Sequence, residues 1–355
     1  MRLPALAIRP GKRVRHATRH VLQVALLLLL CLSGAARACT LPDNYLSDVR
    51  PGLTGEPTAV SLGIGMTDVL GVDDVNQQMD IDFFVRMDWV DPRLATLTGC
   101  RFPVTEVWFP EIYILNSSKL TQKRRNARND VSVEAGGRVV YVNRLTGEVS
   151  TYHNLARFPF DTQIFEIEVS VPESSVTEIV LQPNYERTWL GDKLNIEGWD
   201  FQSIQMDVAD TYLDQLQQTV SVATVKLNAA RKSNYYIYRV LLLLTIVVAM
   251  SWVIFWVPPG RYEFQIGICA TAMLTTIAFN FSVSSVLPRV AYLTVMDRLV
   301  IWAVVLIFLA TVQALITARL IVNEREKLAL RFDHISRYLF PTLFFAGWYL
   351  IIVVL

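Results

Sequence analysis

The hydrophobic and polar positions divide this chain into two parts with different periods. Between residues 40 and 233, short alternating runs are separated by Gly, Pro, Asn or Asp at intervals of about ten residues. In residues 81–89, apolar side chains occupy every odd position, while Asp82, Arg86 and Asp88 lie on the opposite face of the expected strand. Residues 165–171 alternate in the same way. This pattern, without a long helical period, predicts an antiparallel β-sandwich.

After Tyr236 the alternation ends, and four continuous apolar stretches follow at residues 236–257, 264–287, 294–316 and 338–355. Each stretch is long enough to cross a bilayer as a helix, the last one only just. We therefore expect a β-sandwich domain at residues 39–233 and a four-helix transmembrane domain at residues 234–355.

The first 38 residues have the pattern of a secretory signal peptide. A basic stretch is followed by an apolar run at residues 21–32 and by Ala36-Arg37-Ala38, an A-x-A cleavage sequence. The apolar run is too short to span a bilayer. An uncleaved anchor is the alternative. The positive-inside rule also places the sandwich outside the membrane. The connections then expected in the cytoplasm carry Arg261, Arg319, Arg325, Lys327, Arg331 and Arg337, whereas the outer connection holds Arg289 and Arg298.

Composition narrows the class of protein further. The chain has 355 residues, of which 52% are hydrophobic. This fraction is high for a soluble protein, so we expect part of the chain to lie in a membrane. Its net charge of +1 gives no indication of a nucleic-acid partner. Of four cysteines, only Cys39 and Cys100 fall in the oxidising compartment, where they can form a disulfide. The sequence has no metal motif, phosphate loop, or nucleophile and base set, so we expect neither an enzyme nor a cofactor.

The second apolar stretch differs from the others because eight of its residues are Gly, Thr, Asn or Ser. One helical face is acidic and small at its cytoplasmic end, then hydroxylated, then apolar. This order suits a pore, in which a carboxylate ring concentrates cations and an apolar constriction closes by dewetting. Close packing of small residues between membrane helices is the alternative. The face consists of Glu263, Gly267, Thr271, Leu274, Ala278, Phe281 and Ser285.

The stretches Trp108-Phe109-Pro110-Glu111, Phe158-Pro159-Phe160-Asp161 and Leu287-Pro288-Arg289 follow one another along the chain with several others. Together they resemble the pentameric ligand-gated ion channels, the Cys-loop receptor superfamily. The likeness runs from about residue 55 to the end and favours the prokaryotic members without an intracellular domain. The most specific stretch, Phe158-Pro159-Phe160-Asp161-Thr162-Gln163, is similar to the F-P-F-D-x-Q signature. Its flanking cysteines are replaced by Thr151 and Phe165. The other stretches are residues 70–77, 83–89, 108–111 with Asn116, Arg231 with Tyr235-Tyr236, and Leu287-Pro288-Arg289 with Tyr292.

The resemblance implies an all-β, immunoglobulin-like extracellular sandwich followed by four transmembrane α-helices, assembled as a symmetric homopentamer. It further implies a bacterial inner-membrane protein with its N-terminal domain in the periplasm and with membrane lipids around it. Such a channel would conduct cations and open on binding a small-molecule agonist or protons at or near subunit interfaces. The alternative is a membrane-anchored periplasmic sensor that forms oligomers without conducting ions.

The resemblance also assigns roles to individual residues. Glu263 would form a ring favouring cations, unless Arg261 neutralises it. An amine, protons or a carboxylate remain open as agonists, and Phe84 could instead only pack the subunit interface. Asp161 with Arg231 is the preferred ion pair for gating, with structural stabilisation as the alternative. The agonist site would comprise Phe84, Arg86, Leu115, Pro172 and Tyr212. Gating coupling would involve Asp73, Asp74, Phe158, Pro159, Phe160, Asp161, Arg231, Pro288 and Arg289.

Overall fold

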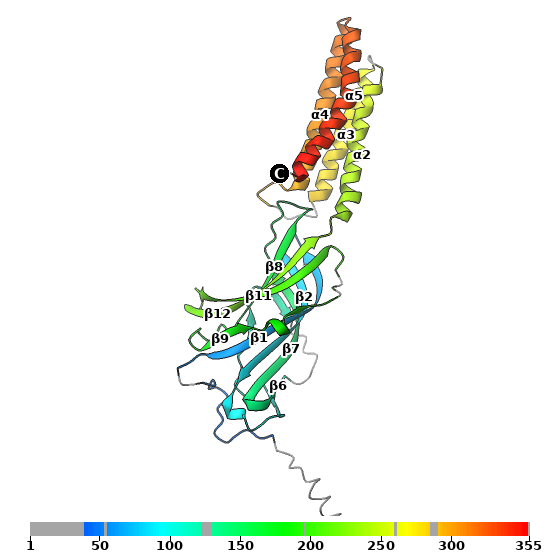
Figure 1. Cartoon of the computed structure of the whole chain (residues 1–355). Helices are drawn as coiled ribbons and strands as arrows, with labels where there is room; N and C mark the ends of the chain where they lie inside the picture. Colours follow the sequence, from blue (N-terminus) through cyan, green and yellow to red (C-terminus); the bar gives the residue numbers. More distant parts are fainter. Residues whose placement is uncertain are drawn as a thin grey trace, which may run out of the picture.

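The computed structural model describes residues 39–355 apart from 53–54, 122–128, 193, 195, 259–260, 285–289 and 354–355. The expected signal peptide and three of the expected site residues, Ser285, Pro288 and Arg289, therefore lie outside the described residues. The chain forms a two-sheet β-domain at one end and a bundle of helices at the other (Figure 1). The C-terminus lies near the junction between the two parts, at the end of the helical bundle that faces the β-domain (Figure 1).

The larger sheet has eight strands, in the order β10-β1-β2-β7-β6-β3, with β9 also paired to β1 and β5 to β7. Its long members pair antiparallel, and Ile64 of β1 lies opposite Val85 of β2. The strands are β1 (Thr58–Asp73), β2 (Gln78–Val90), β3 (Arg101–Pro103), β5 (Ser117–Thr121), β6 (Asp130–Val133), β7 (Arg138–Ser150), β9 (Ile179–Pro183) and β10 (Trp189–Leu190).

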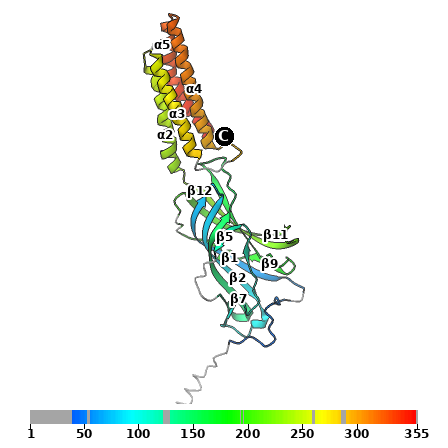
Figure 2. The same ribbon diagram turned by 180° about the vertical axis from the view of Figure 1, so that it is seen from behind.

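The smaller sheet has the order β11-β12-β8-β4 and packs against the first as a sandwich (Figure 2). Its strands are β4 (Tyr113–Ile114), β8 (Thr162–Ser170), β11 (Trp199–Leu213) and β12 (Gln218–Arg231). The alternation seen in the sequence places Phe83 and Val85 of one sheet in the same buried core as Phe165 and Ile167 of the other. Short 3₁₀ helices occur at η1 (Pro92–Leu94), η2 (Ala135–Gly137) and η3 (Tyr185–Arg187).

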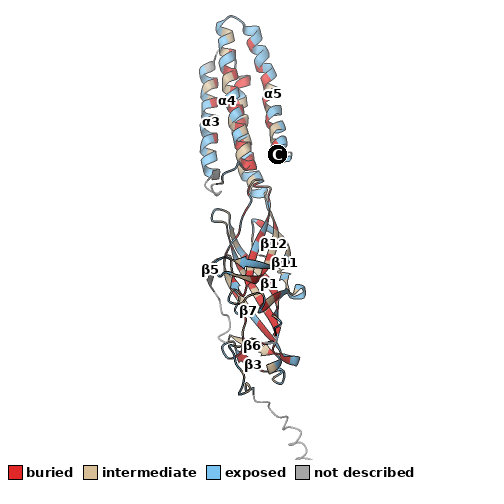
Figure 3. Cartoon of the chain, turned by 90° about the vertical axis from the view of Figure 1, so that its left-hand side faces the viewer, coloured by how far each residue is buried: buried red, intermediate tan, exposed pale blue. Residues whose placement is uncertain are grey.

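Among the described residues, four helical segments are long and apolar enough to cross a membrane. The first combines a π-helical turn, η4 (Tyr236–Leu241), with α2 (Leu242–Trp252) and a 3₁₀ turn, η5 (Val253–Trp256). The others are α3 (Tyr262–Ser284), α4 (Val295–Val322) and α5 (Glu326–Val353). Their outer surfaces are largely exposed in the single chain even though they are apolar, whereas the sandwich buries its apolar faces (Figure 3).

The last two helices are longer than the apolar stretches that predicted them. α4 continues to Val322 rather than ending at residue 316, and α5 begins at Glu326 rather than at residue 338. In the added turns of α5, Ala329, Asp333 and Ser336 form the buried face, while Arg331 is exposed together with the apolar Leu330, Phe332 and Ile335. Hydropathy alone misses these turns, since the charges lower the average without interrupting the helix.

Candidate functional site

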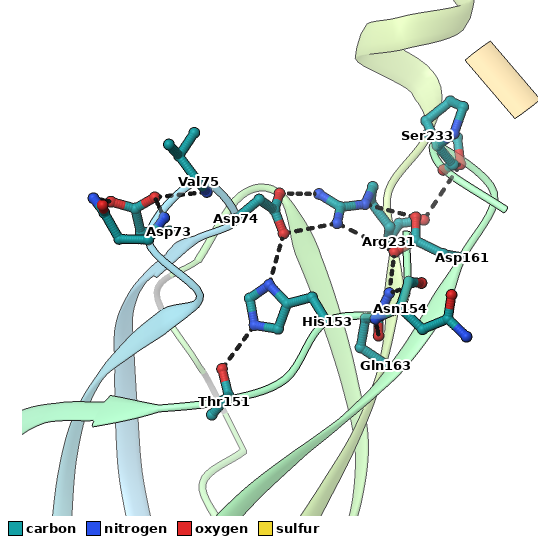
Figure 4. A network of polar contacts seen from close by, with 12 residues as sticks. Asp73, Asp74, Val75, Thr151, His153, Asn154, Asp161, Gln163, Arg231 and Ser233 are labelled. Carbon is teal, nitrogen blue, oxygen red and sulfur yellow. Dashed lines mark hydrogen bonds and ion pairs between the residues drawn. The ribbon is translucent and has the colours of Figure 1, made fainter. Parts of the chain in front are cut away.

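A cluster of buried charged side chains lies where the sandwich meets the helices, at the end of β12. The Arg231 guanidinium contacts Asp161 through Nε at 2.8 Å and Asp74 through Nη1 at 2.6 Å (Figure 4). Its side chain is 4% exposed, and those of Asp161 and Asp74 are 1% and 14% exposed. The expected pair of Arg231 with Asp161 is thus present, and Asp74 is a second direct partner.

Neighbouring polar groups hold both carboxylates in place. Gln163 donates to Asp161 at 2.6 Å and to the Asn154 carbonyl at 2.7 Å. The His153 ring is completely buried between Asp74, at 3.1 Å, and the Thr151 hydroxyl, at 2.7 Å (Figure 4). His153 was not among the residues expected here, because a lone histidine in the sequence does not show which carboxylate it will face.

The surroundings of Asp74 and Arg231 favour the charged forms of both side chains. Burial opposes ionisation of Asp74, but hydrogen bonds from His153 and Arg231 outweigh it and hold the pKa of Asp74 below its ordinary value. Burial likewise opposes the charge of Arg231, and its bonds to Asp74 and Asp161 more than compensate, so its pKa is raised. Asp73 has a different role, because it accepts from the backbone of Val75 and Asn76 and shapes the turn between β1 and β2.

The Phe158-Pro159-Phe160 segment connects this network to the helices. Phe158 is buried in a cluster with Leu241 of η4, Met296 of α4 and Ile351 of α5. Its carbonyl accepts from the Met296 backbone at 3.2 Å, and the Pro159 carbonyl accepts from the Ser233 hydroxyl at 2.7 Å. The Arg231 guanidinium lies 4.9 Å from the Phe158 ring centre. The segment therefore places the end of β12 in contact with η4, α4 and α5 through Phe158.

A second connection between the β-domain and the helices was not predicted from the sequence. The Tyr292 hydroxyl, in the connection from α3 to α4, accepts a hydrogen bond from the Leu155 backbone at 3.0 Å. The Val295 backbone at the start of α4 donates to the Ala156 carbonyl at 3.1 Å. These bonds tie the connection following the pore-helix candidate to the same loop that carries Phe158.

Helix α3 presents the polar stripe on its exposed face. Its inward face buries Gln265, Cys269, Ala272 and Thr276, which recur every three or four residues. The opposite face exposes Leu274 by 69% and Phe281 by 73%. The other described stripe residues, Glu263, Gly267, Thr271 and Ala278, are also exposed. The small residues of the stripe therefore do not serve packing against the other helices of this chain.

The Glu263 carboxylate lies at the start of α3 and is exposed. No salt bridge joins Glu263 to Arg261 among the described residues, and both side chains are exposed. The Thr271 hydroxyl donates to the Gly267 carbonyl at 2.9 Å within the helix. Its oxygen can still accept a hydrogen bond on the exposed side.

The expected agonist residues lie in two groups on different sheets. On the larger sheet, Phe84 lies between its cross-strand neighbours Gly65 and Arg144. The Trp189 ring covers Gly65, where any Cβ would collide with it, so Trp189 adds an aromatic beside Phe84. Arg86 does not present a free guanidinium, because it binds Asp88 at 2.9 Å. Trp189 was not found from the sequence, since its place depends on the small residue beneath it.

On the smaller sheet, Tyr212 is 57% exposed near the end of β11, and the Pro172 carbonyl accepts from Gln218. Leu115 donates its backbone N–H to the Glu168 carbonyl at 2.8 Å. Tyr113 provides an exposed aromatic that the sequence did not single out, and its hydroxyl lies 3.4 Å from Glu173. The nearby Glu111 carboxylate raises the pKa of Tyr113. Phe84 and Tyr212 thus lie on strands of different sheets.

A β-sandwich joined by a buried ionic network to four membrane helices, one of them with a polar exposed face, defines a ligand-gated ion channel. Residues 38–246 match the neurotransmitter-gated ion-channel ligand binding domain. The chain belongs to this family, whose members are ion channels and not enzymes.

Individual relatives extend the similarity into the membrane domain. The chain is 27% identical over 304 residues to a proton-gated ion channel from Gloeobacter violaceus, covering 83% of this chain and 82% of that one. This similarity places it with the prokaryotic members. It is also 24% identical over 287 residues to gamma-aminobutyric acid receptor subunit beta-4 of Gallus gallus, and 21% identical over 282 residues to subunit beta of Caenorhabditis elegans. These matches cover 76% of this chain, but only 57% and 50% of the two receptor subunits.

Proposed function

We propose that this chain forms a homopentameric, cation-selective channel in the bacterial inner membrane, with its sandwich in the periplasm. A small ligand or protons, bound at or near subunit interfaces, open it. The observation that carries the proposal is the exposed face of α3, which bears one carboxylate, small and hydroxylated residues, and then large apolar residues. Packing within the chain uses the opposite face of α3, through Gln265, Cys269, Ala272 and Thr276, so the stripe is available to line a central pathway.

Cation selectivity follows from Glu263. Five copies of an unpaired carboxylate around an axis would attract cations and repel anions in a narrow, weakly screened passage. Further along α3, rings of Leu274, Ala278 and Phe281 would form the closed constriction, since an apolar passage excludes water and ions until it widens.

Opening would begin at the two half-sites and pass through the Arg231 network. Phe84 with Trp189 faces one neighbour, and Tyr212 with Tyr113 faces the other. Aromatic groups on both faces support an organic cation held by cation-π contacts. Glu111 and Glu173, the carboxylates beside Tyr113, support protons as the stimulus equally well. A carboxylate ligand has less support, because Arg86 and Arg144 already bind Asp88 and Asp82.

Voltage-clamp recording from oocytes expressing the chain tests this function. Lowered pH, a panel of amines and a panel of carboxylates serve as stimuli, and reversal potentials are measured in a sodium chloride gradient. We expect a reversal potential near that of sodium, shifted toward that of chloride in Glu263→Gln. Gln265→Glu is not a suitable control because Gln265 is buried, so the matched control is Glu326→Gln at the exposed start of α5. Robust assembly at the cell surface without current under any stimulus would contradict the channel proposal. An unchanged reversal potential in Glu263→Gln would contradict the role of this ring.

A further inference from the structure

The N-terminal segment, residues 39–52, lies at the end of the sandwich away from the helices and is fastened there at both of its ends (dark blue in Figure 1). At its start, the Cys39–Cys100 disulfide joins it to the loop before β3. At its other end, the buried Thr58 hydroxyl of β1 donates to the Pro51 carbonyl at 2.6 Å. Fixing both ends restricts the conformations open to the residues between them.

Between these ends, the Tyr45 hydroxyl makes two hydrogen bonds whose directions are fixed by its partners. It donates to the Asp91 carboxylate at 2.9 Å and accepts from the Trp108 backbone N–H at 3.0 Å. Asp91 is completely buried and also binds the Arg93 guanidinium at 2.7 Å. Burial raises the pKa of Tyr45 to about 12, and the Asp91 charge adds to this rise, so the hydroxyl keeps the proton that it donates.

The bond to Trp108 joins this segment to the smaller-sheet half-site. Trp108 belongs to the connection from β3 to β4, residues 104–112, which also carries Glu111 and leads directly into Tyr113. At its far end the connection enters β4, which pairs with β8. The Tyr45 hydroxyl therefore restrains the connection before Glu111, and the pairing of β4 restrains it after Glu111.

We propose that Tyr45 is a positioning residue for the agonist half-site on the smaller sheet, and that the disulfide-tethered segment sets how readily the channel responds to its stimulus. This inference rests on the proposed function, because it concerns the same half-site. By fixing the Trp108 backbone, Tyr45 holds Glu111 and Tyr113 in place before a stimulus arrives, which lowers the ordering cost of binding. When the competent arrangement is populated for less of the time, more stimulus is needed for the same opening.

Tyr45→Phe tests the restraint, because it removes both hydrogen bonds and retains the ring, whose centre lies 4.4 Å from the Arg93 guanidinium carbon. Hydrogen–deuterium exchange of the purified full-length protein, followed by mass spectrometry, should become about tenfold faster in peptides covering residues 104–112. Exchange in β8 and β12 should stay as in the wild type. Unchanged exchange in residues 104–112, or equally faster exchange across the whole sandwich, would overturn the positioning role.

Ser221→Ala is the matched control for this measurement. It also removes a hydroxyl that accepts from a backbone N–H, that of Leu181 at 3.1 Å, but the bond joins β12 to β9. We expect residues 104–112 to exchange at the wild-type rate in this variant. The same acceleration as in Tyr45→Phe would show that any lost hydrogen bond loosens the connection, and the proposal would fail. The exchange measurement requires no current, so its failure is distinct from failure of the proposed function.

Voltage-clamp recordings test the functional part with two stimuli, lowered pH and tetramethylammonium. Tyr45→Phe should raise the dose for half-maximal current about threefold or more, while the reversal potential stays unchanged because the pore is untouched. A wild-type dose in Tyr45→Phe contradicts the proposal, as does an equal shift in Ser221→Ala. If neither stimulus opens the wild type, the exchange measurement decides alone.

Opening the disulfide tests whether the tether acts through Tyr45. Cys39→Ser with Cys100→Ser, or phosphine reduction of the folded wild type, should accelerate exchange in residues 104–112 as Tyr45→Phe does. In the Tyr45→Phe background the same change should add little, because the bond it supports is already lost. Unchanged exchange on opening the disulfide, or two effects that simply add, would refute the role given to the tethered segment.

Discussion

Replacing Arg231 with Gln tests the junction most directly, because among the described residues it removes the only lysine or arginine that forms an ion pair with Asp161 or Asp74. Asp161 is 1% exposed and accepts its shortest hydrogen bond from Gln163, which cannot neutralise it. Removing one member of a buried ionic cluster leaves uncompensated charge and costs roughly 3 to 5 kcal/mol. For a domain of this size, that corresponds to a decrease in Tm of about 10 °C.

The assay pairs thermal unfolding of the purified channel, followed by tryptophan fluorescence, with concentration–response curves under voltage clamp. Lys226→Gln is the matched control, since Lys226 also binds one carboxylate, Asp207, at 2.9 Å but on the exposed face of β12. We expect little change in the control. Arg231→Gln should lower Tm and move activation to higher stimulus concentrations, because β12 no longer holds the Phe158 loop.

A double-mutant cycle separates pairing from general damage. Adding Asp161→Asn to Arg231→Gln removes a stranded charge, so the double variant should be more stable than the sum of the two single losses predicts, by about 1 to 3 kcal/mol. A charge swap is less informative, because an aspartate at position 231 would face Asp74. The reasoning is refuted if Arg231→Gln behaves like Lys226→Gln, or if the cycle gives no coupling.

Three further predictions concern the pore, pH and the connection between α3 and α4. Leu274→Ser should move activation to lower stimulus concentrations by wetting the constriction, and an unchanged activation curve would count against the pore assignment. The pKa of Asp74 is held below its unfolded value, so its contribution to stability is present above about pH 4 and is lost as pH falls through the folded pKa. Unfolding of the wild type between about pH 5 and 2 should show this loss, and Asp74→Asn should show a shallower dependence in the same range. Tyr292→Phe leaves the Leu155 N–H without its acceptor and should cost about 1 kcal/mol, seen as a weaker response to stimulus. Wild-type responses in Tyr292→Phe would show that this bond does not transmit opening.

Much of the architecture could be predicted from local pattern. Alternation in residues 81–89 and 165–171 gave strands that share one core, and four apolar stretches gave four helices. The ends of the last two helices could not be predicted in this way. The turns before residue 338 are stabilised by a narrow buried stripe including Asp333, which accepts from Gln313 of α4 at 2.8 Å. A hydropathy average does not register such a contact.

The candidate sites divide similarly. The stripe on α3 could be derived from spacing alone, because a single helix sets which of its residues share a face. The pairing of Arg231 with Asp161 could be anticipated, because the two residues have opposite charges and lie on segments that resemble neighbouring segments of the channel family. Asp74 bridging Arg231 to His153, and Trp189 covering Gly65, could not, because each contact joins residues far apart in sequence whose approach depends on strand register.

The sequence by itself therefore determined the two-part organisation, the membrane helices and the polar face of the second helix, since these depend on periodicity within one segment. Only the tertiary structure decided which charges share the junction, that Trp189 lies over Gly65 beside Phe84, and that the Cys39–Cys100 disulfide joins the N-terminal segment to the loop before β3. Those features arise where separate strands and loops are packed together, and their energies depend on burial and distance rather than on residue type alone.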